Sequence, residues 1–554
     1  MSVRFRRGPL AVAQSADRFS DRLFFFFCYV AMISAISTYT ATNCAADDRP
    51  NILWISCEDI SANLGCYGDP NAITPTLDKL ATEGVRFTRA FTPAGVCAIT
   101  RSSIITGMHA PSIGSHHMRS NIIPPPDVKA FAELLRADGY FTTNRSKTDY
   151  QFNAAPSIWD RQGNKHQDWA ERSDPEQPFF SVVNYTQSHE SKIRQDDSAH
   201  ARVRDRIGDS VHDPSKMTGL PPYFPDDDAT RVDWAHYHDN ITYIDALIGD
   251  LLDRLEKDGL VENTVVIFWS DHGMGLPRGK RWLFDTGIHI PVIVRWPGVV
   301  EPGSVREDLV TAIDFAPTTL EIAGIDVPPY HQGRVFLSAD SKRIQTEPAY
   351  LFFHRDRMDE VYDIQRAARD RRWKYIRNYD MEKTYAVHLD YMDKMPTMRR
   401  WREGNANGTL DAKKSIWFKP TKAPEELYDT ENDPWELNNL AGDPQFADRL
   451  ARMRQAVLDW QVEINDKGMI PEAVMMAEMK PEGTPRTDSV KLTSIDGGVL
   501  LTSGTEGSSV VYRKHGEDHW QLYTDALDND QLPVEAMACR LGYQDSPKTT
   551  VKAK

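Results

Sequence analysis

The chain has 554 residues, which is too long for one ordinary domain and predicts a large domain with smaller pieces attached. Its 80 acidic and 65 basic residues give a formal net charge of −15, with the acids spread throughout the sequence. This charge argues against a nucleic-acid binder and leaves no broad basic surface for a long polyanion. Any anionic ligand must therefore be bound locally.

The first 46 residues have the layout of a secretory signal peptide. An Arg-bearing start precedes an apolar run from Leu23 to Ile36, and small residues follow as far as Cys44-Ala45-Ala46. The alternative is an uncleaved anchor, but the apolar run is shorter than the roughly 20 residues that span a bilayer. We therefore expect cleavage, no stable membrane span in the mature chain, and export to a periplasm or to the medium.

Four short apolar runs are predicted to form buried strands, and helical patterns lie between them. The clearest helix has apolar residues from Ile241 to Leu255 at three-and-four spacing on one face. Alternating strands and helices predict an α/β domain with a large, mainly parallel sheet flanked by helices. Ligands bind beyond the carboxyl ends of such strands, so the acids that follow two of them mark a candidate site. The predicted strands are Asn51–Ser56, Phe179–Tyr185, Thr264–Ser270 and Val292–Trp296.

Later segments change in character and predict further domains. Short strand patterns such as Trp373–Ile376 and a closing amphipathic helix around Trp460 indicate a smaller α+β subdomain. From Pro481 onward, Gly-rich turns and alternating apolar residues indicate a small β appendage. The predicted division is a signal peptide at 1–46, a main α/β domain at 47–344, the α+β subdomain at 345–480 and the β module at 481–554.

The most informative segment runs from Gly95 to Gly107 and reads Gly-Val-Cys-Ala-Ile-Thr-Arg-Ser-Ser-Ile-Ile-Thr-Gly. It resembles the sulfatase signature, Cys-x-Pro-Ser/Thr-Arg followed by two positions, two apolar residues and Thr-Gly. The resemblance implies an alkaline-phosphatase-like fold and oxidation of Cys97 to formylglycine by a formylglycine-generating or equivalent maturation enzyme. In that family one hydroxyl of the formylglycine hydrate attacks sulfur, and deprotonation of the other then releases sulfate.

Ile99 stands where the signature has Pro. Another maturation route, a tolerant modifying enzyme and an inactive relative all fit this departure. Without conversion, Cys97 would be a buried small hydrophobe. A disulfide between Cys57 and Cys66 is a further alternative for the remaining cysteines.

Two pairs of polar residues follow predicted strands, Glu58-Asp59 after the first and Asp271-His272 after the third. Alone, each pair would fit a solvated loop or a helix cap. Sulfatases hold a divalent metal ion with residues at these positions, so the resemblance implies that both pairs, together with residue 97, bind one cation. Calcium or magnesium fits because hard cations prefer several oxygen ligands.

The resemblance also assigns cationic residues to the site. Arg101 matches a residue that holds the formylglycine and the metal ligands, and Lys147 matches one that contacts sulfate. His189 and Lys280 match sulfate-binding residues near the leaving group, and either could protonate it. His289 is a further candidate for substrate binding. Asp149 stands where the Lys147 motif usually has His.

The resemblance covers roughly Pro50 to Asn465 and is greatest to bacterial members similar to heparan N-sulfatase, or sulfamidase. It implies hydrolysis of sulfate esters or sulfamates on sulfated glycans such as heparan-type polysaccharides. The alternatives are a phosphatase, phosphodiesterase or phosphonate hydrolase on the related scaffold, and a non-catalytic binder of sulfated glycans.

Overall fold

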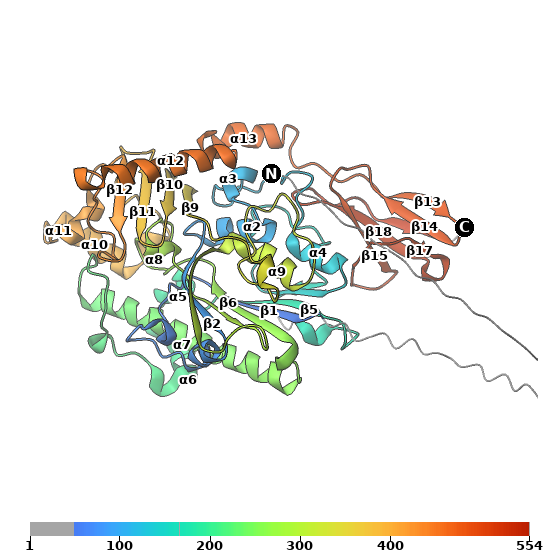
Figure 1. Ribbon diagram of the computed structural model, residues 1–554, viewed down its shortest axis with the longest axis horizontal. Coiled ribbons are helices and arrows are strands. Elements are labelled where there is room, and N and C mark those ends of the chain that lie inside the picture. Colours follow the sequence, from blue (N-terminus) through green and yellow to red (C-terminus); the bar gives the residue numbers. More distant parts are fainter. Residues whose placement is uncertain (1–48, 165–166, 553–554) are drawn as a thin grey trace, which may run out of the picture. The chain divides into compact units, whose positions relative to one another are not determined.

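A mixed sheet of eight strands organises the first part of the chain (Figure 1). The computed structural model describes residues 49–164 and 167–552, so the predicted signal peptide lies outside the described residues. The strand order is β4-β3-β5-β1-β6-β7-β2-β8. Only β7 is antiparallel to its neighbours, and the other pairings are parallel. The predicted mainly parallel α/β sheet is therefore confirmed.

Four of the eight strands coincide with the apolar runs found in the sequence. The other four do not read as apolar runs: β3 carries the buried polar residues Thr142, Thr143 and Asn144, β2 and β8 carry partly exposed charged residues, and β4 has only three residues. The strands are β1 (Asn51–Cys57), β2 (Val85–Phe91), β3 (Phe141–Arg145), β4 (Arg161–Gly163), β5 (Phe179–Tyr185), β6 (Thr264–Ser270), β7 (Val292–Arg295) and β8 (Ser304–Thr311).

Helices cover both faces of the sheet, as the central strand β1 shows. Ile55 packs into a core that includes α7 (Asp228–Lys257), whereas Trp54 packs with α2 (Cys97–Thr106) and α4 (Phe131–Ala137). Figure 1 shows α7 on one side of the sheet and α2 with α4 on the other. Each large apolar side chain buried in this way stabilises the fold by about 1.5–3 kcal/mol. Neither α7 nor any other described helix is long and apolar enough to cross a membrane.

The strand order brings four loops together at one edge of the sheet. Strands β3, β5, β1 and β6 are neighbours and run parallel, so the loops that follow them leave on the same side. Cys57, the last residue of β1, is level with Tyr185 at the end of β5 and with Ser270 at the end of β6. This edge is where a doubly covered parallel sheet binds its ligands.

A second sheet follows, with four antiparallel strands in the order β12-β11-β10-β9. Helix α12 packs against β10 and β11, with Met453 and Val457 in a core that includes Tyr375. The strand and the closing helix predicted for this region are both present. The elements are β9 (Leu351–Met358), β10 (Val361–Arg369), β11 (Trp373–Asn378), β12 (Glu425–Asp429), α10 (Pro396–Ala406), α12 (Ala447–Glu463) and α13 (Glu472–Met479).

The last strands form two small sheets, β13-β14-β17 and β16-β15-β18-β19, which adjoin α4 (Figure 1). Lys129 Nζ donates to Gly507 O at 2.8 Å and to Ser509 Oγ at 2.7 Å. Val511 and Met537 belong to the same apolar core as α4. The C-terminal strands thus pack against the main α/β domain. The division of the chain into four segments, with the boundaries expected from sequence, stays a prediction. The strands are β13 (Lys491–Ile495), β14 (Gly498–Thr502), β15 (Ser509–Lys514), β16 (Gln521–Leu522), β17 (Leu527–Asp528), β18 (Val534–Cys539) and β19 (Thr549–Val551).

The cysteines of the described chain are all free thiols, at positions 57, 66, 97 and 539. The alternative of a disulfide between Cys57 and Cys66 is therefore wrong. The fold keeps them apart because Cys57 is locked into β1, where its side chain is fully buried in the core.

Candidate active site

Cys97 is the first residue of α2, and its side chain is 3% exposed. The turn before it is fixed by Thr100, whose hydroxyl donates to Ala94 O at 2.9 Å. Gly95 is required there, since a Cβ atom would lie 2.6 Å from Trp282 O. The first turn of a helix leaves backbone N–H groups without helical partners and carries partial positive charge, so Cys97 stands where an anion is stabilised.

Ile99 occupies the third position of the same helix and is fully buried. The backbone N–H at that position has no partner within a helix, which is why Pro is tolerated in a first turn. Replacing the family's Pro by Ile therefore leaves the helix and the placement of Cys97 intact. The departure from the family's Pro therefore has no consequence for folding.

The polar pairs after β1 and β6 form one buried cluster. Asp59, Asp271 and His272 are each 0% exposed, and their ligand atoms lie within 4.8 Å of one another. His272 Nε2 is 3.0 Å from Asp59 Oδ1 and 3.6 Å from Asp271 Oδ1. Glu58 is buried beside them, and burial and Asp271 raise the pKa of its carboxyl.

This cluster fits a divalent cation. The other ring nitrogen of His272 lies 2.9 Å from Gly273 O, so Nδ1 donates a proton there, and Nε2, where a proton or a cation binds, faces two carboxylates. Although burial opposes it, Asp271 and Asp59 raise the pKa of His272 to about 10, which shows how strongly this point attracts positive charge. Carboxylate oxygens with one imidazole are a suitable donor set for a metal ion.

Arg101 and Lys147 tie the cluster to cationic groups. Arg101 Nε donates to Asp271 Oδ2 at 3.1 Å, and Nη1 donates to Asn184 Oδ1 at 2.8 Å. Arg101 Nη2 is buried and has no partner among the described residues, so one N–H group of the guanidinium is free for an anionic oxygen. Lys147 Nζ pairs with Glu58 Oε1 and lies 3.5 Å from Asp149 Oδ2.

Lys280 and His189 lie beside Asp59. Lys280 Nζ is 2.9 Å from Asp59 Oδ2 and 3.2 Å from Glu190 Oε1. Burial and the charge of Lys280 lower the pKa of His189 to about 4, so its ring is neutral near pH 7. Since His189 Nδ1 accepts the Ser191 backbone N–H at 3.3 Å, its Nε2 carries the hydrogen.

The sulfur of Cys97 lies among these groups. The side chain of Cys97 contributes to the pKa of His272, Arg101, Lys147 and Lys280, so it lies close to all four. The structure thus brings together nine of the ten residues predicted from sequence, which are Glu58, Asp59, Cys97, Arg101, Lys147, His189, Asp271, His272 and Lys280.

His289 is the exception. Its Nε2 lies 2.9 Å from Thr88 O, and its ring packs on Phe91 with centroids 5.1 Å apart. It lines a separate cavity of about 360 Å³ with Asp285 and Arg369. Because β7 is antiparallel, its start lies level with the end of β6, so His289 lies at the same end of the sheet, but it pairs with Phe91 of β2 and not with the strands that carry the cluster.

Several supporting residues were missed. Asn184, in β5, accepts from Arg101 and from Ser56 Oγ at 2.6 Å, so it fixes the guanidinium against two strands. A buried amide inside an otherwise apolar strand was the available signal. Glu190 and Arg281 form a buried two-hydrogen-bond pair at 2.8 and 3.0 Å beside Lys280. Each directly follows a predicted site residue in the sequence.

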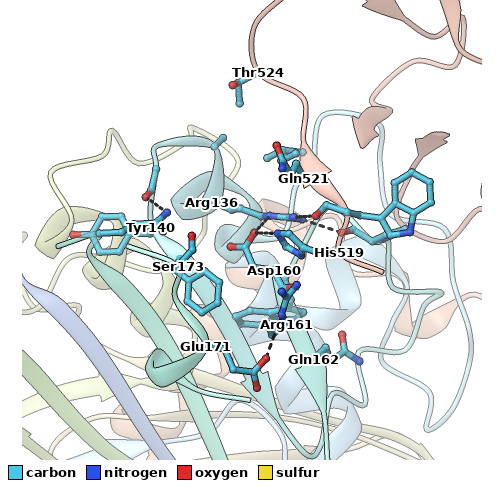
Figure 2. A pocket seen from close by; sticks show the side chains of 18 of the residues that line it. Arg136, Tyr140, Asp160, Arg161, Gln162, Glu171, Ser173, His519, Gln521 and Thr524 are labelled. Carbon is cyan, nitrogen blue, oxygen red and sulfur yellow. Dashed lines mark hydrogen bonds and ion pairs between the residues drawn. The ribbon is translucent and has the colours of Figure 1, made fainter. Parts of the chain in front are cut away.

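A cavity of about 1050 Å³ lies elsewhere, between β4 and the C-terminal β module. Figure 2 shows Arg136 held between Asp160 and the main chain of the module, with His519 facing Asp160. None of the clustered residues lines this cavity. Its walls combine ion-paired side chains such as Arg136 and Asp160 with aromatic ones such as Trp159 and Trp520.

Comparison with known proteins identifies the family of this chain. Residues 50–325 match the sulfatase family, and residues 275–399 match the family described as N-sulphoglucosamine sulphohydrolase, C-terminal. An ulvan-active sulfatase of Formosa agariphila is 34% identical over 95% of this chain and 97% of its own length. This chain belongs to the sulfatase family. Sulfatases are sulfuric ester hydrolases.

Two further relatives agree. Human N-sulphoglucosamine sulphohydrolase is 27% identical over 80% of this sulfatase and 96% of its own length. A solved enzyme bound to its substrate D-glucosamine-2-N,6-O-disulfate has the same fold, with a TM-score of 0.54 and 19% identity over 76% of this chain and 99% of that one. The sulfatase fold predicted from the Cys97 segment is therefore confirmed.

Proposed function

We propose that this sulfatase removes sulfate from sulfated glycans outside the cytoplasm, with a formylglycine derived from Cys97 and one divalent cation. The single observation that carries the proposal is the meeting of Cys97, at the start of α2, with a buried carboxylate–imidazole cluster and three cations. The named activities of the ulvan-active and N-sulphoglucosamine relatives support a glycan substrate.

The cation would be held by Glu58, Asp59, Asp271 and His272, and calcium is our first candidate because oxygen donors dominate. When bound, it supplies Lewis-acid polarisation of a sulfate oxygen and favours an ionised nucleophile. The formylglycine hydrate supplies an attacking hydroxyl and a release step that a serine would lack.

The chain's own residues orient and neutralise the substrate. Arg101 is fixed by Asp271 and Asn184, and its free Nη2 is placed to hold an oxygen on residue 97. Lys147, which pairs with Glu58, and Lys280, which pairs with Asp59, would cancel the charge of the sulfate oxygens. Both are paired with carboxylates when no sulfate is bound, so the fold keeps them charged.

The leaving atom would meet His189 or Lys280. His189 presents an Nε2–H group and is the more exposed of the two. It can therefore donate a hydrogen bond to the leaving oxygen or nitrogen, while Lys280 holds a proton throughout because Asp59 and Glu190 keep its pKa high against the effect of burial.

The test is sulfate release, measured by ion chromatography, from ulvan and heparan oligosaccharides with protein purified from its native host. A second arm compares an aryl sulfate with the matching aryl phosphate, and chelation followed by calcium addition tests the cation. We expect sulfate release by the wild type and none by Cys97→Ala, with a formylglycine mass for the peptide containing residue 97.

Preference for the aryl phosphate would instead support a phosphatase. Glycan binding without turnover, with an unmodified thiol at residue 97 in every molecule, would support a non-catalytic binder. The predicted export is tested separately, by N-terminal sequencing of protein recovered from the periplasm and the medium.

A further inference from the structure

Tyr391 lies at the mouth of the site. Its ring makes an edge contact with His189, with centroids 5.9 Å apart and an interplanar angle of 69°. His189 and Tyr391 are partly exposed, whereas Asp59 and Lys280 behind them are buried. These two rings are therefore more accessible to solvent, and to the body of a substrate, than Asp59 and Lys280.

Three cations surround the Tyr391 ring. The guanidinium carbon of Arg194 is 4.5 Å from the ring centroid, Lys394 Nζ is 5.7 Å away and the guanidinium carbon of Arg281 is 5.9 Å away. The charge of Arg281 is neutralised, since it pairs with both Glu190 and Asp359. Aromatic faces stabilise cations in this arrangement by about 0.5–1 kcal/mol at exposed sites.

Arg194 and Lys394 differ from Arg281 because neither forms an ion pair with a carboxylate anywhere in the described chain. The acids nearest Lys394 in sequence are occupied elsewhere: Asp390 pairs with His388, and Asp393 pairs with Arg402. Asp196, the acid nearest Arg194, caps helix α6 (Asp197–Ile207) by accepting from Ala199 N at 2.9 Å. The protein as a whole has a net charge of −15, but at Tyr391 two cations without a carboxylate partner among the described residues make the charge locally positive. Because the chain has no broad basic surface, an anionic ligand must be bound by local groups, and these two cations are such groups.

We propose that Arg194 and Lys394, held by Tyr391, form a subsite for a second anionic group of the substrate, a carboxylate or another sulfate on the sugar that carries the scissile sulfate or on its neighbour. The subsite rests on the proposed function, since it places the glycan with its scissile sulfate next to His189. Its consequence is selectivity for glycans with more than one charge. Arg194 and Lys394 bind substrate, and Tyr391 positions them.

The test compares wild type with Arg194→Ala, Lys394→Ala and the double variant on substrates that differ in one charge. One arm uses the ulvan or heparan oligosaccharide that the wild type hydrolyses, before and after chemical reduction of its carboxylates. The other uses D-glucosamine-2-N,6-O-disulfate against the two monosulfates. Arg452→Ala/Lys413→Ala is the matched control, because it removes two exposed cations that form no ion pair in the described chain.

We expect the double variant to lose about 10- to 100-fold in kcat/KM on the doubly charged substrate, mainly through KM, and to change less than about twofold on the singly charged one. Tyr391→Phe should keep the preference and Tyr391→Leu should weaken it, because only the former retains an aromatic face. The arm in which the preference disappears identifies the second anion as carboxylate or sulfate.

An equal loss on both substrates, or an unchanged preference in the double variant, would overturn the subsite while leaving the proposed function standing. A wild type that releases no sulfate from any of these probes would overturn the proposed function instead. Unchanged melting temperatures of the single variants separate either result from misfolding.

Discussion

The pair between Arg281 and Glu190 offers a direct measure of how the site is held together. Arg281 donates to both carboxylate oxygens of Glu190, at 2.8 and 3.0 Å, and the two side chains are 4% and 3% exposed. Although burial opposes it, Arg281 and Lys280 hold the pKa of Glu190 at about 2. Arg281→Met keeps the length of the side chain but leaves Lys280 as the cation that still pairs with Glu190.

Removing one partner of a buried pair costs about 3–5 kcal/mol when the other charge is left without compensation, and the lower end of this range applies to Glu190 because Lys280 still pairs with it. We expect this loss in the free energy of unfolding of Arg281→Met, measured by guanidinium denaturation followed through tryptophan fluorescence. The double variant Arg281→Met/Glu190→Gln should recover part of it. Arg206→Met is the control, because its pair with Asp250 is exposed and contributes at most about 1 kcal/mol.

A loss below about 1 kcal/mol in Arg281→Met would refute this reasoning, as would a double variant whose loss equals the sum of the single ones. Either result would mean that the two charges are not coupled. Activity should fall as well, because an unpaired Glu190 draws Lys280 away from the substrate.

Three more predictions follow from other parts of the chain. Ile99→Pro should raise the fraction of residue 97 found as formylglycine by mass spectrometry without lowering the melting temperature; a folded protein with an unchanged fraction would contradict a recognition role for Pro. Burial raises the pKa of Asp233 to about 7, so its carboxyl stabilises the fold most below about pH 4 and that contribution is lost as the pH rises through 7, by up to about 4 kcal/mol. Asp233→Asn should therefore flatten the fall in unfolding free energy over this range, and a slope identical to wild type would disprove the assignment. A chain ending at residue 480 should be poorly soluble, because it exposes the core shared by α4 and Val511; a soluble product with wild-type melting would show that the β module is independent.

The sequence determined the α/β class, because apolar runs and helical periodicity report burial directly. Strands β1, β5, β6 and β7 were predicted to within one or two residues. Strand β3 was missed, since its buried Thr142, Thr143 and Asn144 make hydrogen bonds that only neighbouring strands and loops provide.

The residues of the site were also named from sequence, through the segment around Cys97 and the polar pairs after two strands. What only the tertiary structure decided is which of them meet. No local sequence pattern predicts the order β3-β5-β1-β6. This order places Lys147, His189, Asp59 and Asp271 together at the carboxyl ends of the strands. The same order left His289 outside, because its backbone pairs with Phe91 of β2, which lies beyond β7 from β6.

The cations around Tyr391 illustrate the same division. Arg194 and Lys394 are 200 positions apart, and nothing in the sequence distinguishes them from the other basic residues. They become a candidate subsite only because the fold sets both on one ring and gives neither a carboxylate partner among the described residues. The residue type determines which chemistry a side chain can perform, whereas the packing of the chain determines which groups surround its charge.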